Sequence, residues 1–351
     1  MSAANLAGRD EALRALCVPF EHGAITLPDD GRVLFLGARA GSDLARWATP
    51  GWCCVQTFKP FADALRHAGL GVGTPDADAR YGCVLLLPAR QRDEARMMLA
   101  RAAIHAAADG VIVASAANHA GARSLQADME ALLGPVEVIS KHKCRVMLAK
   151  PETRATNASL RDQWLAFDAL RENATGLLSR PGLFAWDHVD AASALLAECM
   201  PASLAGRAAD LGAGTGFLSV ALIRQCVGIR AVDLYEADAR ALPAARANLA
   251  AACSKLGRDV ECAVHWHDVT TGIEGGYDVI ISNPPFHQGH ADLPELGRAF
   301  IASAAGGLRK GGVLWMVANR HLPYEATLRV HFAQVRTVAE RDGFKVIKAR
   351  R

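Results

Sequence analysis

The chain lacks several of the features that assign a protein to a class from composition alone. Its 351 residues contain no run of about 18 uncharged apolar residues, so no transmembrane helix is expected. The first ten residues lack a basic segment followed by an apolar core, so no secretory signal is expected. The formal net charge is only +3, which is weaker than the plainly basic balance of many nucleic-acid-binding domains.

Cysteine is scattered, and its pattern excludes two further classes. The nine cysteines include the adjacent pair Cys53-Cys54 but no Cys-x-x-Cys motif, so neither a zinc site nor a disulfide framework is expected. His265, His267 and Asp268 lie on one predicted strand, but such a set rarely closes a metal site without further ligands. We therefore predict a cytoplasmic protein with reduced thiols, no metal and no membrane partner.

The tetrapeptide Asn283-Pro284-Pro285-Phe286 is the most informative motif that is present. It follows the apolar run 277–282, which predicts a buried strand. The two prolines fix φ and remove two backbone donors. The Asn283 side-chain oxygen and the Pro284 carbonyl are therefore free to accept hydrogen bonds from one planar NH₂ group, and Phe286 is placed to stack on its ring. The alternative is a rigid loop that only ends the strand.

A glycine-rich turn lies upstream of this motif. Asp210 begins the string Asp-Leu-Gly-Ala-Gly-Thr-Gly, and a helix is predicted over 218–224. Glycines at Gly212, Gly214 and Gly216 allow a tight turn and a close approach of ligand to backbone. The spacing differs from the dinucleotide fingerprint, and no Gly-Lys-Ser/Thr occurs, so a phosphate cradle is not expected. Asp210 suits a ligand with an ammonium group, such as S-adenosylmethionine.

Two further acids end the next two predicted strands. Glu236 ends the strand 229–236, at the place where a partner of ribose hydroxyls is expected. Asp268 ends the strand 260–268, beyond a helix predicted over 239–252, and suits an adenine amino group. Each acid alone is equally well read as a loop charge or a helix cap. Three acids that end successive strands indicate a cofactor site.

Together these residues resemble the class I S-adenosylmethionine-dependent methyltransferases, and most closely the bacterial ribosomal RNA guanine-N2 methyltransferases of the small-subunit type. The resemblance covers roughly residues 155–349 and includes the segments 179–184, 283–287 and 318–324. It implies methyl transfer from S-adenosylmethionine to the exocyclic N2 amine of a guanine in 16S rRNA. Asn283, Pro284, Pro285 and Phe286 are then the catalytic residues, Asn283 also contacts the cofactor, and His287 is a tentative substrate contact.

Other functions remain open at this level. The large-subunit 23S rRNA enzymes resemble this chain almost as closely, and adenine-N6 and protein glutamine methyltransferases share the Asn-Pro-Pro-aromatic motif. A non-enzymatic RNA-binding assembly factor with a relic site is a further alternative. The continuation to His287 argues against the adenine-N6 and glutamine activities, and the intact acids argue against the assembly factor. The expected partner is ribosomal RNA within the small subunit, and a monomer is favoured.

The first half of the chain repeats the second in degenerate form. Residues 32–41 look like a strand that enters a glycine turn, with Leu36 in place of the expected acid, and Leu87-Pro88-Ala89-Arg90 replaces the tetrapeptide. A helix over 93–108 and a strand over 110–114 follow, as 293–308 and 312–317 do later. Such a repeat indicates duplication.

We therefore predict an α/β fold of two tandem Rossmann-like methyltransferase domains, the N-terminal one degenerate. The expected boundaries are 1–150 for the degenerate domain, 151–180 for a linker and one helix, and 181–351 for the catalytic domain. Two basic clusters are either phosphate-contacting patches or solvated faces. They comprise Lys141, His142, Lys143 and Arg145 in the first half, and Arg341, Lys345, Lys348, Arg350 and Arg351 at the C-terminus.

Overall fold

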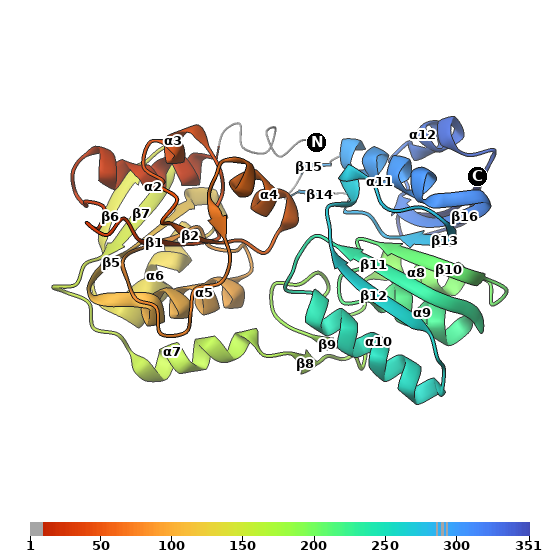
Figure 1. Cartoon of the computed structure of the whole chain (residues 1–351), viewed down its shortest axis with the longest axis horizontal. Helices are drawn as coiled ribbons and strands as arrows, with labels where there is room; N and C mark the ends of the chain where they lie inside the picture. The colour runs from red at the N-terminus through yellow and green to blue at the C-terminus, as the bar shows by residue number, and fades with distance from the viewer. Residues whose placement is uncertain (1–9, 286, 289–290, 293) are drawn as a thin grey trace. The chain divides into compact units, whose positions relative to one another are not determined.

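The computed structural model describes residues 10–285, 287–288, 291–292 and 294–351 (Figure 1). These residues form two compact units. The N-terminal unit contains residues 10–169 and Arg180–Gly182, and the C-terminal unit contains Leu170–Ser179 and Leu183–Arg351. The segment predicted as a linker is thus divided between the units. Its helix α7 (Ala158–Leu165) belongs to the first, where the Arg96 guanidinium lies 5.3 Å from the ring centre of Trp164.

The N-terminal unit is built on a seven-stranded sheet of order β3-β2-β1-β4-β5-β7-β6. Strand β7 is antiparallel to both of its neighbours, and the other pairs are parallel. The strands are β1 (Val33–Leu36), β2 (Cys53–Val55), β3 (Gly71–Val72), β4 (Tyr81–Leu86), β5 (Ala106–Ala117), β6 (Glu137–Lys141) and β7 (Cys144–Ala149). The other helices are α2 (Glu11–Glu21), α3 (Ser42–Ala45), α4 (Lys59–His67), α5 (Arg92–His105) and α6 (Ala122–Leu133).

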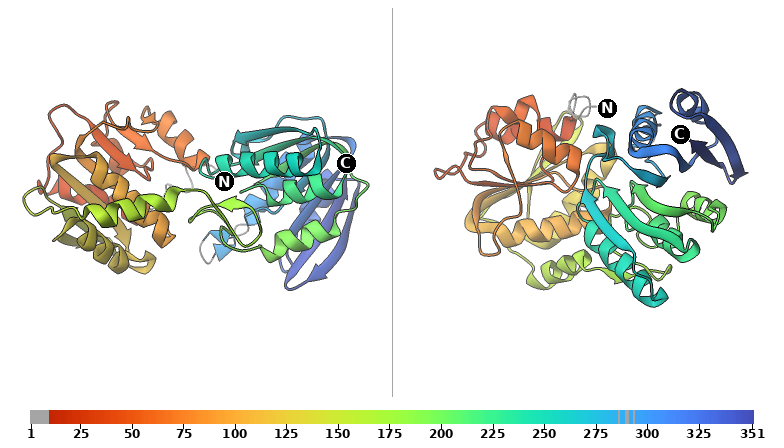
Figure 2. Two further views of the ribbon diagram at one scale, coloured as in Figure 1. Left: turned by 90° about the horizontal axis from the view of Figure 1, so that it is seen from below. Right: turned by 45° about the vertical axis from the view of Figure 1, so that its right-hand side comes forward.

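The C-terminal unit repeats this topology in a second sheet, of order β12-β11-β10-β13-β16-β18-β17. The strands are β10 (Ala205–Leu211), β11 (Gly228–Glu236), β12 (Glu261–Trp266), β13 (Tyr277–Ser282), β16 (Leu308–Asn319), β17 (Gln334–Arg341) and β18 (Phe344–Arg350). Helices α8 (Ala191–Cys199), α9 (Phe217–Gln225) and α10 (Leu242–Leu256) pack into one apolar cluster with the sheet. Helices α11 (Pro294–Gly307) and α12 (Tyr324–His331) pack into another, so both faces are covered (Figure 2).

The shared strand order confirms the prediction of two tandem α/β domains. Several predicted elements have other bounds in the structure. The helix expected over 93–108 ends at His105, because β5 begins at Ala106 and pairs there with Tyr81. The strand expected over 260–268 ends at Trp266, and the helix expected over 239–252 is α10, Leu242–Leu256. The central strands form because their apolar runs are buried on both faces, as in β13, where Val279, Ile280 and Ile281 are at most 2% exposed.

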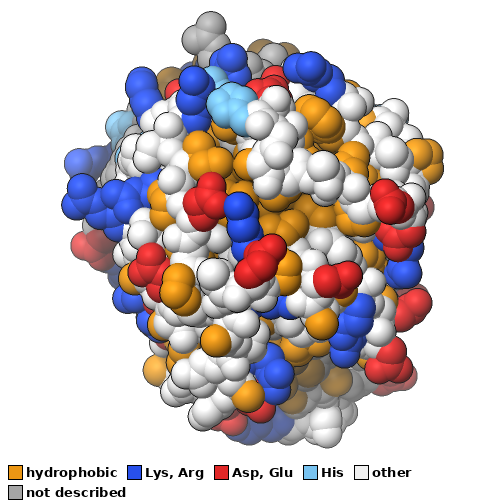
Figure 3. All heavy atoms as spheres, turned by 90° about the vertical axis from the view of Figure 1, so that its left-hand side faces the viewer, with side chains coloured by type: hydrophobic (Ala, Val, Ile, Leu, Met, Phe, Trp, Pro, Cys, Tyr) orange, Lys and Arg blue, Asp and Glu red, His pale blue; other side chains and the backbone are white. Residues whose placement is uncertain are grey.

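The two basic clusters differ in their availability. Lys141 and Lys143 are exposed around the turn between β6 and β7. On the face of the molecule drawn in Figure 3, basic side chains lie among acidic and apolar ones. At the C-terminus Lys345 is only 4% exposed and donates to Glu325 at 2.6 Å, and Arg341 pairs with Glu198 at 2.6 Å. These two cations are therefore engaged within the protein.

All nine cysteines lie in the described residues, and none is in a disulfide. Within the same described ranges, no helix combines the length and the apolar character that a membrane crossing requires.

Candidate active site

The carboxyl ends of β10 and β13 lie side by side, and this juxtaposition creates the candidate site. Leu211 pairs with Ser282 at the end of the two strands, so the glycine loop after β10 and Asn283 after β13 leave the sheet together. The strand order reverses between these two strands, and such reversals leave a crevice that binds ligands in α/β sheets.

A pocket opens at this edge. It is formed by the glycine loop, the first turn of α8 and the segment 173–190. Its lining residues are Asn173, Thr175, Leu177, Phe184, Ala185, His188, Val189, Asp190, Ser193, Gly212, Ala213, Gly214, Thr215, Phe217, Leu218 and Asn283. The predicted Gly212, Gly214 and Asn283 are thus brought together.

The three glycines of the loop have different tasks. Gly212 has φ +74° and Gly214 has φ +54°, and both line the pocket. Gly216 has φ +87° and precedes α9, and a Cβ there would lie 3.4 Å from Leu234 Cδ2. Gly216 is outside the lining, and its positive φ, not a lack of space for a Cβ, favours glycine there. Contact of Gly216 with a cofactor stays a prediction.

Asn283 is held by the start of helix α8. Its Nδ2 donates to Asp190 Oδ2 at 2.9 Å and to Ser193 Oγ at 2.8 Å. Within the described part of the chain, neither Asn283 Oδ1 nor the Pro284 carbonyl accepts a hydrogen bond, which leaves both predicted acceptors free. Pro284 is buried and Pro285 is exposed.

Asp210 lies beneath the loop, not in the lining of the pocket. It is fully buried, and its Oδ2 accepts from Ser219 Oγ at 2.7 Å. Its Oδ1 has no partner among the described residues. Burial raises the pKa of this carboxyl to about 7, against the hydrogen bonds from Ser219, which lower it. An acid of this kind is sensitive to a positive charge placed nearby.

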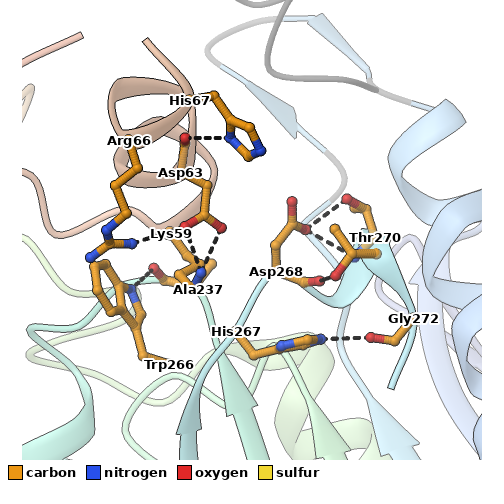
Figure 4. Close-up of polar contacts among 11 residues, drawn as sticks. Lys59, Asp63, Arg66, His67, Ala237, Trp266, His267, Asp268, Thr270 and Gly272 are labelled. Atoms are coloured by element: carbon orange, nitrogen blue, oxygen red, sulfur yellow. Dashed lines mark hydrogen bonds and ion pairs between the residues drawn. The ribbon is translucent and has the colours of Figure 1, made fainter. Parts of the chain in front are cut away.

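Glu236 ends β11 as predicted, whereas Asp268 lies beyond the end of β12 at Trp266 and caps the short turn that follows. Both acids accept backbone hydrogen bonds. Glu236 Oε2 accepts from the Gly214 amide and Oε1 from the Asp238 amide, each at 2.7 Å. A carboxylate has about four acceptor sites, so each oxygen retains capacity for a ribose hydroxyl. Asp268 Oδ1 accepts from the amide and hydroxyl of Thr270 at 2.9 and 2.7 Å (Figure 4). Cofactor binding by both acids stays a prediction.

Two predicted site residues fall where the structure gives no side-chain information. Phe286 lies outside the described residues, and for His287 only the backbone is described, in the short strand β14 (His287–Gln288). Their predicted contacts with the substrate base therefore remain predictions.

His265 of β12 and His267, which follows β12, have partners that do not suggest a metal. His265 Nε2 lies 3.0 Å from Asp233 Oδ1. His267 Nε2 contacts the Gly272 carbonyl at 2.6 Å (Figure 4). Across the described residues, no group of three or more His, Cys, Asp or Glu side chains is placed to hold a metal ion.

The comparison with known proteins agrees with this geometry. The sequence model of the methyltransferase small domain matches residues 174–348, which contain the glycine loop, the three acids and the Asn283 motif. The C-terminal half of the chain belongs to the methyltransferase small domain family. This finding confirms the resemblance that the motifs indicated.

Relatives extend the similarity beyond the methyltransferase domain. The chain is 29% identical to the ribosomal RNA small subunit methyltransferase C of Shewanella amazonensis over 77% of each chain. It is 38% identical to the protein of the same name from Escherichia coli O9:H4 over 48% of this chain and 47% of that one. Among solved structures, the 16S rRNA N2 methyltransferase RsmC of T. thermophilus, in complex with AdoMet and guanosine, aligns with a TM-score of 0.76. It is 25% identical and the alignment covers 98% of this chain and 92% of that one.

The glycine loop of the N-terminal unit lacks the acid of the methyltransferase domain. Gly37 and Gly212 are equivalent, because each donates its amide to a carbonyl at the end of the second strand, at 3.0 and 2.9 Å. Phe35 therefore stands where Asp210 stands, and the assignment of Leu36 to this place was wrong. Both Phe35 and Asp210 are fully buried, so the substitution replaces a buried carboxyl by a ring.

Two further positions of the N-terminal loop differ. Gln56 stands where Glu236 does, and its Nε2 donates to the Ala38 carbonyl at 2.7 Å, whereas Glu236 accepts from the methyltransferase loop. Arg39 stands where Gly214 does. Its side chain pairs with Asp10, the N-cap of α2, and its guanidinium carbon lies 5.6 Å from the ring centre of Phe61.

Sequence reasoning missed most of the wall of the pocket. From the sequence, no role was assigned to Asp190, Ser193, Asn173 or Phe184. Phe184 is 68% exposed at the pocket, and the backbone of the next residue, Ala185, has φ +48°. An exposed aromatic side chain beside a strained residue is a structural signal that the spacing of motifs does not carry.

Proposed function

We propose that this chain transfers a methyl group from S-adenosylmethionine to the N2 amine of a guanine in 16S rRNA. The observation that carries the proposal is the orientation of Asn283. Its NH₂ group is bound on the protein side, and its Oδ1 is left to accept from an amine in the pocket. The RsmC structure that aligns with 98% of the chain is in complex with AdoMet and guanosine, which supports both ligands.

The residues that line the pocket and those that support its glycine loop suit this cofactor. Asp190 lines the pocket with an acidic group, and Asp210 lies directly beneath the loop, so both can favour a ligand with ammonium and sulfonium charges. Glu236 is placed at the end of the second strand, where ribose hydroxyls are bound in related folds. Gly214 has no atom within 4 Å of its Cβ position, which leaves space for close approach.

The mechanism requires mainly acceptors and alignment. When bound, S-adenosylmethionine supplies a methyl group that its positive sulfur has already activated. The guanine N2 is a poor nucleophile, because its lone pair is delocalised into the ring. Asn283 Oδ1 and the Pro284 carbonyl would accept from the N2 hydrogens and stabilise the positive charge that develops on nitrogen. The same two contacts fix the amine in line for transfer.

The choice of substrate rests on the relatives. The RsmC of T. thermophilus acts on the N2 of the guanine at position 1207. We propose the equivalent nucleotide of 16S rRNA for this chain, either in the small subunit or in its rRNA, with a monomer acting in the cytoplasm. The N-terminal unit would support the methyltransferase domain and take part in holding RNA, with Lys141 and Lys143 as exposed cations.

The proposal is tested by supplying labelled S-adenosylmethionine with small subunits, large subunits, free rRNA, DNA and total protein, and mapping the product by mass spectrometry. N2-methylguanosine in 16S rRNA is expected. Label in 23S rRNA, in an adenine or in a protein amide would assign one of the alternative activities. A lack of transfer together with a lack of cofactor binding would leave only the assembly-factor alternative.

A single variant locates the activity. Asn283→Ala should keep its affinity for the cofactor and lose roughly a hundredfold in kcat, the scale of one oriented polar contact in a transition state. Gln225→Ala, which removes an exposed amide of the same unit outside that pocket, is the control. Equal losses of binding and turnover in Asn283→Ala would show that the residue is only structural.

A further inference from the structure

The first turn of α8 makes more hydrogen bonds than the start of a helix needs. Asp190 is its N-cap, and Asp190 Oδ2 accepts from the Ser193 amide at 2.7 Å. The same oxygen accepts from Asn283 Nδ2 at 2.9 Å, and Ser193 Oγ accepts from this nitrogen at 2.8 Å. Both hydrogens of the Asn283 NH₂ group are thus bound to one helix start.

This arrangement selects one of the two orientations of the Asn283 amide. An ionised carboxylate is an acceptor only. The NH₂ end of Asn283 must therefore face Asp190, and Oδ1 must face away from it. With the amide turned over, Oδ1 would face the carboxylate, and an NH₂ group would face the amine of the substrate. Two donors facing each other cannot form the hydrogen bond that the reaction requires.

The N-terminal unit provides an internal comparison. Its helix α2 begins with Asp10, whose Oδ1 accepts from the Leu13 amide at 3.1 Å. The cap is therefore kept in this unit. Leu13 stands where Ser193 does, and Leu87, the residue after β4, stands where Asn283 does, and both leucines are buried. The unit without the amide has also lost the hydroxyl that binds it, although its helix starts in the same way.

We propose that Asp190 and Ser193 are positioning residues that hold the Asn283 amide with Oδ1 toward the methyl-accepting amine. This inference rests on the proposed function, since it assigns the orientation of its main acceptor. Neither residue needs to touch the substrate amine. Their effect is carried by Asn283, and it concerns turnover more than the binding of RNA.

Two variants at one position separate this role from the others. Asp190→Asn keeps an oxygen that can accept from both the Ser193 amide and Asn283. Asp190→Ser keeps a good N-cap, but its shorter side chain does not reach Asn283. Both variants lose the same negative charge, so any loss of cofactor affinity is common to them. Ser193→Ala removes the second acceptor and leaves the backbone amide that the cap uses.

The measurements are kcat at saturating S-adenosylmethionine, KM for 16S rRNA, cofactor affinity by calorimetry and Tm. We expect the kcat of Asp190→Asn to exceed that of Asp190→Ser by about tenfold, with a similar KM for RNA. Loss of one oriented contact to the reacting group lowers kcat by about a hundredfold or more, and here that contact is weakened, not removed. The double variant Asp190→Ser with Ser193→Ala should approach the kcat of Asn283→Ala. Equal kcat values in the two Asp190 variants would overturn the proposal. It would also be overturned if Asp190→Ser had a Tm so low that partial unfolding explained its lower kcat.

A second measurement, by NMR, does not depend on turnover. The side-chain NH₂ signals of Asn283 in NMR should exchange slowly with solvent in the wild type and in Asp190→Asn, and faster in the double variant. If the wild type methylates no RNA but the exchange rates follow this order, the proposed function fails while the positioning contact stands. If exchange is the same in all variants, the positioning contact fails by itself.

Discussion

The pH dependence of stability offers a direct test of the buried Asp210. Its folded pKa is raised from 3.8 to about 7, mainly by burial. The folded state therefore binds more protons than the unfolded state between these values, and its stability falls as the pH rises through 7. Integration of the proton linkage from pH 5 to pH 8 gives a loss of about 2–3 kcal/mol for this one group.

Asp210→Asn removes the titration and keeps the shape of the side chain. The free energy of opening can be measured from hydrogen exchange of the β10 amides, which reports on the C-terminal unit without the other unit. We expect the wild type to lose about 2–3 kcal/mol more than the variant between pH 5 and pH 8 in the absence of cofactor. Saturating S-adenosylmethionine should flatten the wild-type curve, because a nearby positive charge favours the ionised carboxylate.

The same coupling predicts release of protons when the cofactor binds near pH 7. Calorimetry in buffers of different ionisation enthalpy measures this release directly, and it should be absent in Asp210→Asn. Parallel pH curves for the wild type and the variant, with no difference in proton release, would refute the assignment of a protonated Asp210. The assigned cause, burial beneath the glycine loop, would then be wrong as well.

Two further changes separate packing from binding. Gly216→Ala and Gly214→Ala should each destabilise the C-terminal unit by ~1 kcal/mol, because both glycines have a positive φ. Only Gly214→Ala should also weaken cofactor binding, because Gly214 lines the pocket and Gly216 does not. Equal losses of cofactor affinity in the two variants would contradict this division. Arg39→Met removes the Arg39–Asp10 ion pair and should destabilise the N-terminal unit by only ~1 kcal/mol, because the pair is partly exposed. Calorimetry should still find one bound cofactor per chain. A second bound cofactor would show that the N-terminal unit has kept a binding site.

The sequence was sufficient to place the elements of the site in order along the chain. The apolar residues 279–281 before Asn283 made its strand predictable from pattern, and the glycine spacing after Asp210 made the turn before α9 predictable. The duplication followed from the same reasoning, and it is confirmed by the matching strand orders. The bounds of the helices were less predictable, since helix α5 and strand β5 meet at His105 and Ala106 without a glycine or proline between them.

The internal geometry of the site was not predictable in the same way. Asn283 and Asp190 are 93 residues apart, and only the folded sheet brings α8 to the end of β13. Motif spacing also places Asp210 near the loop without showing that it lies beneath it. The equivalence of Phe35 and Asp210 was missed, because it depends on the hydrogen bonds of Gly37 and Gly212 and not on residue type.

Arg39 gives the glycine loop of the N-terminal unit a contact that is part of the chain and cannot dissociate. A loop that binds a dissociable ligand gains stability only in proportion to the logarithm of ligand concentration. The methyltransferase domain is subject to that dependence, so its resistance to unfolding should follow the supply of S-adenosylmethionine in the cell. In the N-terminal unit the loop is stabilised by the ion pair between Arg39 and Asp10, which does not depend on a ligand. Starvation for the cofactor should therefore weaken one half of the protein and leave the other unchanged.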